Sequence, residues 1–238
     1  MLNLGLNLSS TAVQEGPVSR GTSYSNSYSL VFDGSDDYVS IGDVSDLDFG
    51  SGNFSVSFWG KTSTDAIGTI IGKQDTGSGW YLYYDTDDQI KYYDRKNDKY
   101  TIGNPDSFDP DGVWRHVVFV KEGIDGKIYV DGIDATESSD GIGGDVDSAG
   151  DNCEIGRRNL GGSESRIFTG NLDEIAIFDT ALSLSAVQDI YNLGTPKDES
   201  STANLVGYWR FEEGSGSSVA DSSSNSNAGT ISGSAAHS

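Results

Sequence analysis

The chain has 238 residues, a length that fits one all-β domain or two small domains. Of these residues 35% are hydrophobic and 11% aromatic, so large rings can fill a core and wholesale disorder is excluded. Its 37 acidic residues against 15 basic ones give a formal net charge of −22, which makes nucleic acid and anionic membrane surfaces poor partners. One cysteine and two histidines exclude a disulfide framework within the chain and a zinc site built from those residues.

The first 28 residues are predicted to form an arm followed by a linker. Leu2, Leu4, Leu6 and Leu8 alternate with Asn and Gly, which predicts a strand with one apolar face. A lone strand has to pair with something, so these leucines are candidate partner-binding residues. They could add an edge strand to their own domain, or bind a neighbouring chain. The start has no continuous apolar block of a secretory signal, so we expect synthesis in a cytoplasm.

Residues 29–178 are predicted to form short strands separated by turns. Alternating apolar and polar residues mark the strands, and Gly, Asp, Ser and Asn mark the turns. The predicted strands are 29–33, 38–41, 54–59, 67–73, 80–85, 89–93, 113–121, 127–130, 152–157 and 166–178. A series of this kind predicts an all-β sandwich or jelly roll.

One helix is predicted between residues 183 and 194. Ser183 is suited to cap its start and Gly194 its end. An apolar stripe along one side indicates a surface helix that packs on a sheet. The stripe consists of Leu184, Val187, Ile190 and Tyr191.

Five short motifs occur in a fixed order along the chain. They are LVFDGSDDYV at 30–39, FSVSFW at 54–59, GVWRHVVFV at 112–120, KIYVDG at 127–132 and GNLDEIAIF at 170–178. Together they resemble the laminin G-like and pentraxin-like jelly rolls of the concanavalin A-like lectin/glucanase superfamily, over roughly residues 29 to 232. The resemblance implies one domain at 29–238 with two antiparallel sheets and one short helix. Because this fold hosts lectins, enzymes, adhesion modules and structural proteins, it does not decide the function.

The sequence LVGYWRFEEGSGSS at 205–218 is out of its usual place. In similar proteins such a strand begins the domain, whereas here it follows the FDG-like strand. The resemblance therefore implies a permuted strand at 205–212 that completes the sandwich, with Trp209 and Phe211 in or near the core. The alternative is the start of a second repeat, which would leave these aromatic side chains without a sheet.

The resemblance to glucanases does not extend to their catalytic carboxylates. Retaining glucanases of this superfamily hold two carboxyl groups about 5–5.5 Å apart, and no Glu-x-Asp-x-Glu-like run exists here. Asp173 and Glu174 are adjacent, and a regular strand directs adjacent side chains to opposite faces. We predict that the chain is not an enzyme.

A loop at 221–227, DSSSNSN, resembles the calcium-binding loop D-x-S-G-N-x-N of some family members. The resemblance implies a structural Ca²⁺ ion, which prefers oxygen ligands. The implied ligands are Asp221, Asn225, Asn227 and Asp173. Serines replace the glycines of the family pattern, so a hydrogen-bonded turn without metal is an equal alternative.

A hairpin rich in aromatic residues is a candidate sugar site, because aromatic rings can stack on sugars. Strand alternation places about half of the rings in the core, so aromatic packing is the alternative. The candidate ligand-binding residues are Trp80, Tyr83, Tyr84, Tyr92 and Tyr93.

Two classes of function remain open. The first is a non-catalytic surface protein of a virion or other assembly, such as a bacteriophage capsid decoration or tail fibre, held by its arm and able to bind host glycans. It would act at the virion surface, with other virion proteins or further copies of itself as partners. The second is a calcium-dependent carbohydrate-binding module of a secreted or cell-surface protein.

Overall fold

The computed structural model describes residues 24–146, 148–160 and 163–238. The predicted partner-binding residues Leu2, Leu4, Leu6 and Leu8 lie outside this part of the chain. Within it, no helix combines the length and the apolar character needed to span a bilayer.

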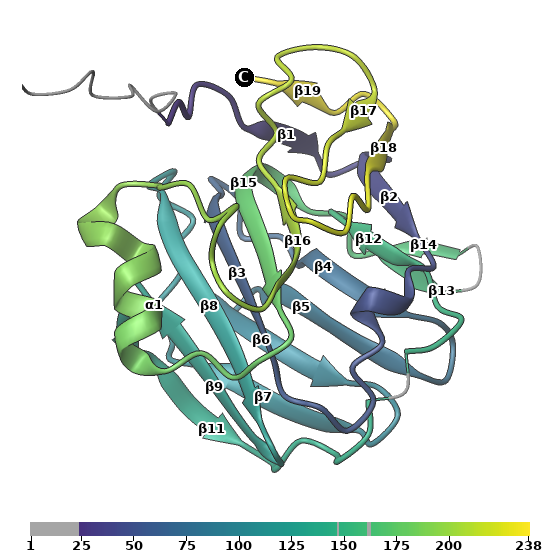
Figure 1. Cartoon of the computed structure of the whole chain (residues 1–238), viewed down its shortest axis with the longest axis vertical. Helices are drawn as coiled ribbons and strands as arrows, with labels where there is room; N and C mark the ends of the chain where they lie inside the picture. Colours follow the sequence, from purple (N-terminus) through teal and green to yellow (C-terminus); the bar gives the residue numbers. More distant parts are fainter. Residues whose placement is uncertain (1–23, 147, 161–162) are drawn as a thin grey trace, which may run out of the picture.

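Two antiparallel sheets make up most of the described chain (Figure 1). The strands of the first sheet are β1 (Leu30–Asp33), β3 (Phe54–Lys61), β8 (Arg115–Glu122), β9 (Asp125–Val130), β10 (Ile133–Asp134), β15 (Thr169–Phe178), β16 (Leu205–Trp209) and β19 (Ala236–His237). Their order is β10-β9-β8-β3-β15-β1-β19, and β16 also pairs with β15.

The second sheet contains nine strands of the described chain. They are β2 (Tyr38–Gly42), β4 (Gly68–Gln74), β5 (Gly79–Asp85), β6 (Gln89–Asp94), β7 (Lys99–Gly103), β11 (Thr136–Ser139), β12 (Cys153–Ile155), β17 (Ser218–Val219) and β18 (Gly229–Ser232). Their order is β11-β7-β6-β5-β4-β12-β2-β18-β17. A small hairpin, β13 (Arg158–Leu160) and β14 (Ser163–Ser165), precedes β15. The predicted two-sheet antiparallel sandwich is confirmed.

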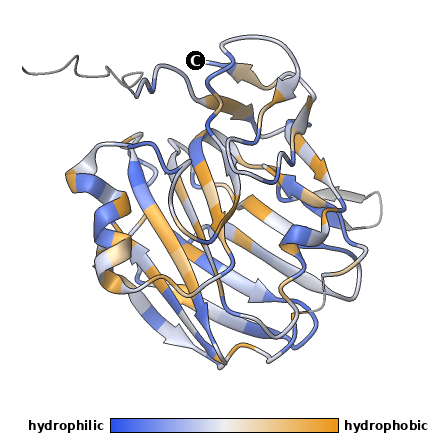
Figure 2. Cartoon of the chain, in the orientation of Figure 1, coloured by the Kyte–Doolittle hydropathy of each residue, from blue (hydrophilic) through white to orange (hydrophobic). Residues whose placement is uncertain are grey.

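The core lies between the sheets and follows the alternation of the strands. On β3, Phe54, Val56 and Phe58 are fully buried, and Figure 2 shows apolar and polar residues along the strands of both sheets. The Phe54 ring lies 5.8 Å from Phe119 of the first sheet and 5.1 Å from Trp80 of the second, centroid to centroid. Aromatic packing between the sheets therefore compensates for the low apolar content.

The predicted helix is present as α1 (Leu184–Tyr191) on the outer face of the first sheet (Figure 1). The Ser183 hydroxyl accepts a hydrogen bond from the Ala186 amide at 3.3 Å, which confirms the N-cap. The α-helix ends earlier than predicted, because Asn192 already adopts the left-handed conformation (φ 47°), two residues before Gly194 (φ 87°). Asparagine tolerates that conformation better than most side chains. A 3-10 turn, η2 (Asn192–Gly194), follows the helix, and another, η1 (Ser45–Leu47), precedes β3.

The C-terminal strands complete both sheets. Strand β16 pairs with β15, Trp209 opposite Ile175, and the Trp209 and Phe211 side chains are fully buried. Strand β18 pairs with β2, and β19 pairs with β1. The prediction that 205–212 supplies a paired strand with its aromatics in the core is confirmed, and the alternative of unpaired aromatics is excluded.

Eight short strands of the described chain lie outside the predicted strands: β7, β10, β11, β13, β14, β17, β18 and β19. Strands of two to five residues carry too few side chains for alternation to show. They form because neighbouring strands offer backbone partners, as β6 does for β7.

Candidate functional site

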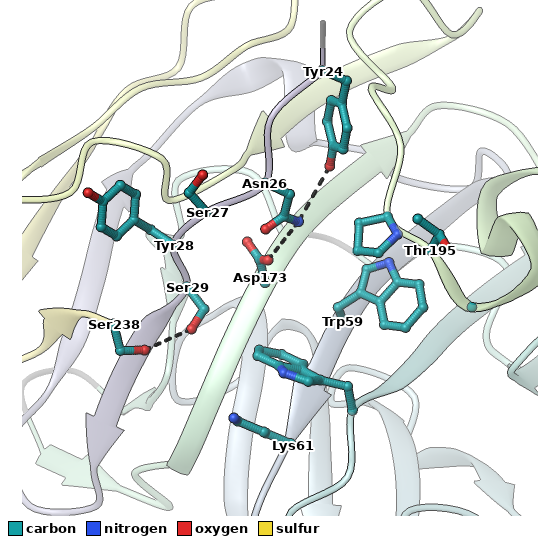
Figure 3. Close-up of a pocket in the computed structure, with 13 residues that line it drawn as sticks. Tyr24, Asn26, Ser27, Tyr28, Ser29, Trp59, Lys61, Asp173, Thr195 and Ser238 are labelled. Carbon is teal, nitrogen blue, oxygen red and sulfur yellow. Dashed lines mark hydrogen bonds between the residues drawn. The ribbon is translucent and has the colours of Figure 1, made fainter.

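A cavity of about 610 Å³ opens on the outer face of the first sheet, where the chain before β1 crosses it (Figure 3). This volume lies within the range of about 300–1,000 Å³ typical of small-molecule sites. Its walls come from β3, β15, the segment before β8, the loop after α1 and the two ends of the described chain. The aromatic and polar side chains that line it include Tyr24, Asn26, Trp59, Lys61, Trp114 and Asp173.

Two tryptophans form the aromatic side of the cavity. Trp59 alternates with the core residue Phe58, so its indole lies on the outer face, where it stacks on Tyr191 of α1 at 6.1 Å between centroids. The Lys61 ammonium lies 4.9 Å from the ring centre of Trp114, a cation–π contact. The helix thus fixes one indole, and a lysine covers part of the other.

Asp173 lines the acidic side of the cavity, and a bulge in β15 places Glu174 beside it. Asp173 is opposite Trp59, but Ala176 is opposite Ser57, so β15 has one extra residue between these pairs. Glu174 takes a positive φ of 50° there. The Asn26 amide nitrogen lies 3.0 Å from Asp173 Oδ2 and 3.2 Å from Glu174 Oε1. The expectation that the two acids point to opposite faces is wrong, since it assumed a regular strand.

Glu174 is engaged by the protein on both oxygens. The Tyr24 hydroxyl donates to Oε1 at 2.7 Å, and the Tyr208 hydroxyl donates to Oε2. Arg210 Nε lies 3.5 Å from Oε1. Burial raises the pKa of Glu174, while these three partners lower it. Its role is therefore to hold Tyr24 and Asn26 in place.

Asp173 is buried, 4% exposed, and has no counter-charge among the described residues. Its Oδ1 accepts the Glu174 amide at 2.9 Å and its Oδ2 accepts Asn26, but no lysine or arginine nitrogen of the described chain lies within 4.0 Å. Burial, and then the charge of Glu174, raise the pKa of Asp173 to about 8. Each oxygen thus accepts one hydrogen bond of the two that it can take, and Asp173 is among the residues that line the cavity. Figure 3 shows Asn26 pointing toward this carboxylate and Tyr24 pointing toward Asn26.

The predicted sugar-binding residues divide between two faces of the second sheet, away from this cavity. Trp80, Tyr84 and Tyr92 are fully buried between the sheets, so their assignment as ligand-binding residues is wrong. Alternation along β5 and β6 directs them inward, where large rings fill the core.

Tyr83 and Tyr93 lie on the outer face of the second sheet. There the Tyr81 ring lies 5.2 Å from Tyr83 and 5.4 Å from Tyr93, and the Arg166 guanidinium lies 4.9 Å from the Tyr83 ring centre. Tyr83 is only 4% exposed. A sugar site on this tyrosine face stays a prediction.

Three of the predicted calcium residues, Asp221, Asn225 and Asn227, come together in one loop through hydrogen bonds. Asp221 accepts four hydrogen bonds, from the backbone amides of Tyr208, Ser223 and Asn227 and from the Ser223 hydroxyl, at 2.7–2.8 Å. Asn225 donates its amide to the Val206 carbonyl at 3.1 Å. A carboxylate has about four lone-pair sites, so Asp221 as arranged does not fit a calcium ligand. Asp173 bonds Asn26 and Glu174 instead, and the calcium prediction stays untested.

Sequence reasoning missed most of the cavity. Trp59 follows Ser55 and Ser57 on the polar face of the predicted strand 54–59, and an indole on a polar face was a usable signal. Lys61 continues this face in β3, beyond the predicted strand. Nothing in the sequence indicated that Tyr24 and Asn26 would cross to β15, a separation of about 150 residues.

Comparisons with known proteins agree with this architecture. A laminin G family model, described as the concanavalin A-like lectin/glucanases superfamily, matches residues 33–188. No curated protein matches the chain.

Solved structures share the fold at low sequence identity. A protein of Bacteroides ovatus to which carbohydrate binding has been ascribed superposes with a TM-score of 0.65 at 16% identity, over 89% of this chain and 59% of that one. The heptameric pentraxin of Limulus polyphemus gives 0.52 at 19% identity, over 70% and 82%. Domains LG4-5 of the mouse laminin alpha1 chain give 0.51 at 15% identity, over 67% and 43%. The chain belongs to the laminin G family of the concanavalin A-like lectin/glucanase superfamily.

Proposed function

We propose that the chain is a non-catalytic carbohydrate-binding module and that its ligand occupies the cavity between Trp59, Trp114 and Asp173. The observation that carries the proposal is the combination of two indoles with a buried carboxylate around about 610 Å³ of open space. Indole faces pack against the apolar faces of sugar rings, and a few fixed polar groups select the hydroxyl pattern. The carbohydrate binding ascribed to the Bacteroides ovatus protein of similar fold supports the same class of ligand.

The contacts of Asp173 and Glu174 support a role without catalysis. A retaining glycosidase needs one free nucleophile and one free acid, whereas Glu174 is bonded by Tyr24, Tyr208 and Arg210. Asp173 alone remains open to a ligand, so the geometry supports binding without bond cleavage.

The test is a glycan array followed by calorimetry with the glycans that bind. Trp114→Ala should lower affinity about tenfold or more, as loss of a central aromatic contact does. Tyr93→Ala, on the tyrosine face, is the matched control and should leave affinity unchanged. The glycans should be recovered uncleaved.

Other outcomes would contradict the proposal. If Tyr93→Ala abolished binding while Trp114→Ala did not, the site would lie on the tyrosine face. If no glycan bound, the module would not be a lectin.

A surface role in a virion or other assembly is a separate proposal. It depends on residues 1–23, which lie outside the described chain, and so does the proposed location at a virion surface. The contacts of residues 25–28, which connect residues 1–23 to the first sheet, support this proposal. The amides of Ser27 and Tyr28 both donate to Glu212 at 2.8 Å, and Arg210 donates to the Ser25 carbonyl.

A further inference from the structure

The acidic side of the cavity carries more negative charge than the protein neutralises. Asp173, Glu174 and Glu212 gather around residues 24–28, and Arg210 is the one cation that the described chain places in contact with this group, through Glu174. Glu212 is occupied by two backbone amides, and Glu174 by Arg210 and two tyrosines. Glu212 is also partly exposed to solvent, whereas Asp173 is buried with no cation in contact among the described residues, so its ionised form lacks a counter-charge. Burial and the charge of Glu174 raise the pKa of Asp173 to about 8, so without a ligand the carboxyl is largely protonated at neutral pH.

A buried carboxylate without a counter-charge is costly, and proteins normally pair such groups. Asp173 is 4% exposed, yet its side chain borders the cavity (Figure 3). Its two hydrogen-bond donors, the Asn26 amide and the Glu174 amide, are both neutral. A ligand cation that entered the cavity would supply the missing charge.

The aromatic walls favour the same kind of group. An ammonium group is attracted to the face of an indole, and Lys61 already makes this contact with Trp114 at 4.9 Å. Lys61 lies beyond ion-pair distance of Asp173, so it does not neutralise the carboxylate. Its remaining donor hydrogens are available to hydroxyl oxygens of a sugar ring.

Building on the proposed carbohydrate function, we propose that the cavity selects sugars that carry a free amino group, with the ammonium bound by Asp173 and the ring between Trp59 and Trp114. N-acetylation removes the positive charge and adds bulk at that position. An acetylated or neutral sugar would bring no positive charge to balance the ionised form of Asp173. The acid side of the cavity thus determines which member of the carbohydrate class binds.

The experiment compares three probe sets on the full chain by ligand-observed NMR and calorimetry. The probes are methyl glycosides of glucosamine and galactosamine with their short oligomers, the same compounds N-acetylated, and the parent neutral sugars. We expect the amines to bind about tenfold or more tightly than their acetylated forms, as expected for a desolvated charge pair. Each measurement is repeated with chelator and with added Ca²⁺, and neither should change the preference.

Two variants locate the effect. Asp173→Asn keeps the shape of the side chain and removes the charge, so it should abolish the preference for amines. Asp75→Asn removes one charge at an exposed turn after β4 and should leave the preference intact. The comparison of amine with acetylated sugar needs only the unaltered protein, so a folding defect in a variant does not prevent the test.

Three other outcomes of the binding experiment would each contradict part of the proposal. Equal or tighter binding of acetylated or neutral sugars would overturn the selection of amines and leave the carbohydrate function standing. Binding of Ca²⁺ at Asp173, with sugar binding dependent on it, would show that the missing charge is a metal ion. If no sugar bound at all, the proposed function would fail as well.

Discussion

At the scale of single residues, one bulge determines the chemistry of the cavity. A regular β15 would direct Asp173 and Glu174 to opposite faces, which would bury one of them in the core. The extra residue at Glu174, with φ 50°, brings both acids to the outer face instead. There Glu174 organises the polar network while Asp173 faces the cavity. Bulges often reorient side chains near functional sites in this way.

The raised pKa of Asp173 predicts a pH dependence of stability. The pKa of this carboxyl is about 3.9 in the unfolded chain and about 8 in the fold, so the fold binds its proton more tightly. This difference contributes in full to the free energy of unfolding below pH 4. That contribution is lost as pH rises through 8, because the ionised form is disfavoured in the fold. Asp173→Asn cannot ionise, so at pH 8 it should be more stable than the unaltered protein by about 2 kcal/mol after allowance for relaxation.

Urea unfolding at a series of pH values from 4 to 9 measures this difference, with Asp75→Asn as the control for net charge. The gap between Asp173→Asn and the unaltered protein should close toward pH 4. Curves that stay parallel across the whole range would show that Asp173 ionises normally in the fold.

At the scale of elements, the C-terminal strands and the loop at 221–227 form one unit. Trp209 donates its indole N–H to the Asn227 carbonyl at 2.9 Å, and Asp221 accepts the Tyr208 amide at 2.8 Å. The loop therefore supports strand β16, and Tyr208 of that strand bonds Glu174 at the cavity. The Asp, Ser and Asn residues of this loop serve as hydrogen-bond partners for backbone groups that would otherwise be unsatisfied.

This arrangement predicts that Asp221 stabilises the fold without a metal. Asp221→Ala should lower the free energy of unfolding by about 3 kcal/mol, since hydrogen bonds to a charged acceptor are lost. Thermal melts in chelator and in millimolar Ca²⁺ should coincide, because the carboxylate oxygens are already occupied. A melting temperature that rose with Ca²⁺ concentration would indicate that the loop rearranges around the ion, and would support the calcium prediction.

At the scale of the whole molecule, the charge of −22 governs association. Copies of so acidic a chain repel each other, although the Debye length of about 8 Å at physiological ionic strength limits the range. Self-association then needs a specific apolar contact. The apolar face predicted for Leu2, Leu4, Leu6 and Leu8 is the candidate for that contact.

Removal of residues 1–23 tests this role directly. If the leucine strand joins copies of the chain, the full chain should be oligomeric in light scattering and the 24–238 chain should be monomeric. The measurement is made at about 0.15 M salt, where a Debye length of about 8 Å limits the repulsion between copies. Both should keep the same circular dichroism spectrum from the sheets. Equal masses for the two chains would contradict self-association through the arm. A melting temperature lowered by the deletion would favour an edge strand within the same domain.

The sequence by itself determined the sandwich, most of its long strands, the helix with its Ser183 cap and the burial of Trp209 and Phe211. The strands, the sandwich and the helix follow from periodicity, turn residues and capping residues, which are local features of the sequence. The burial of Trp209 and Phe211 was implied by the resemblance to laminin G-like jelly rolls. The tertiary structure alone decided the cavity. It depends on a bulge that periodicity does not reveal and on Asn26 crossing to Asp173, 147 positions away. It also decided that Trp80, Tyr84 and Tyr92 fill the core, because the face to which a ring points is settled by the register of the sheets.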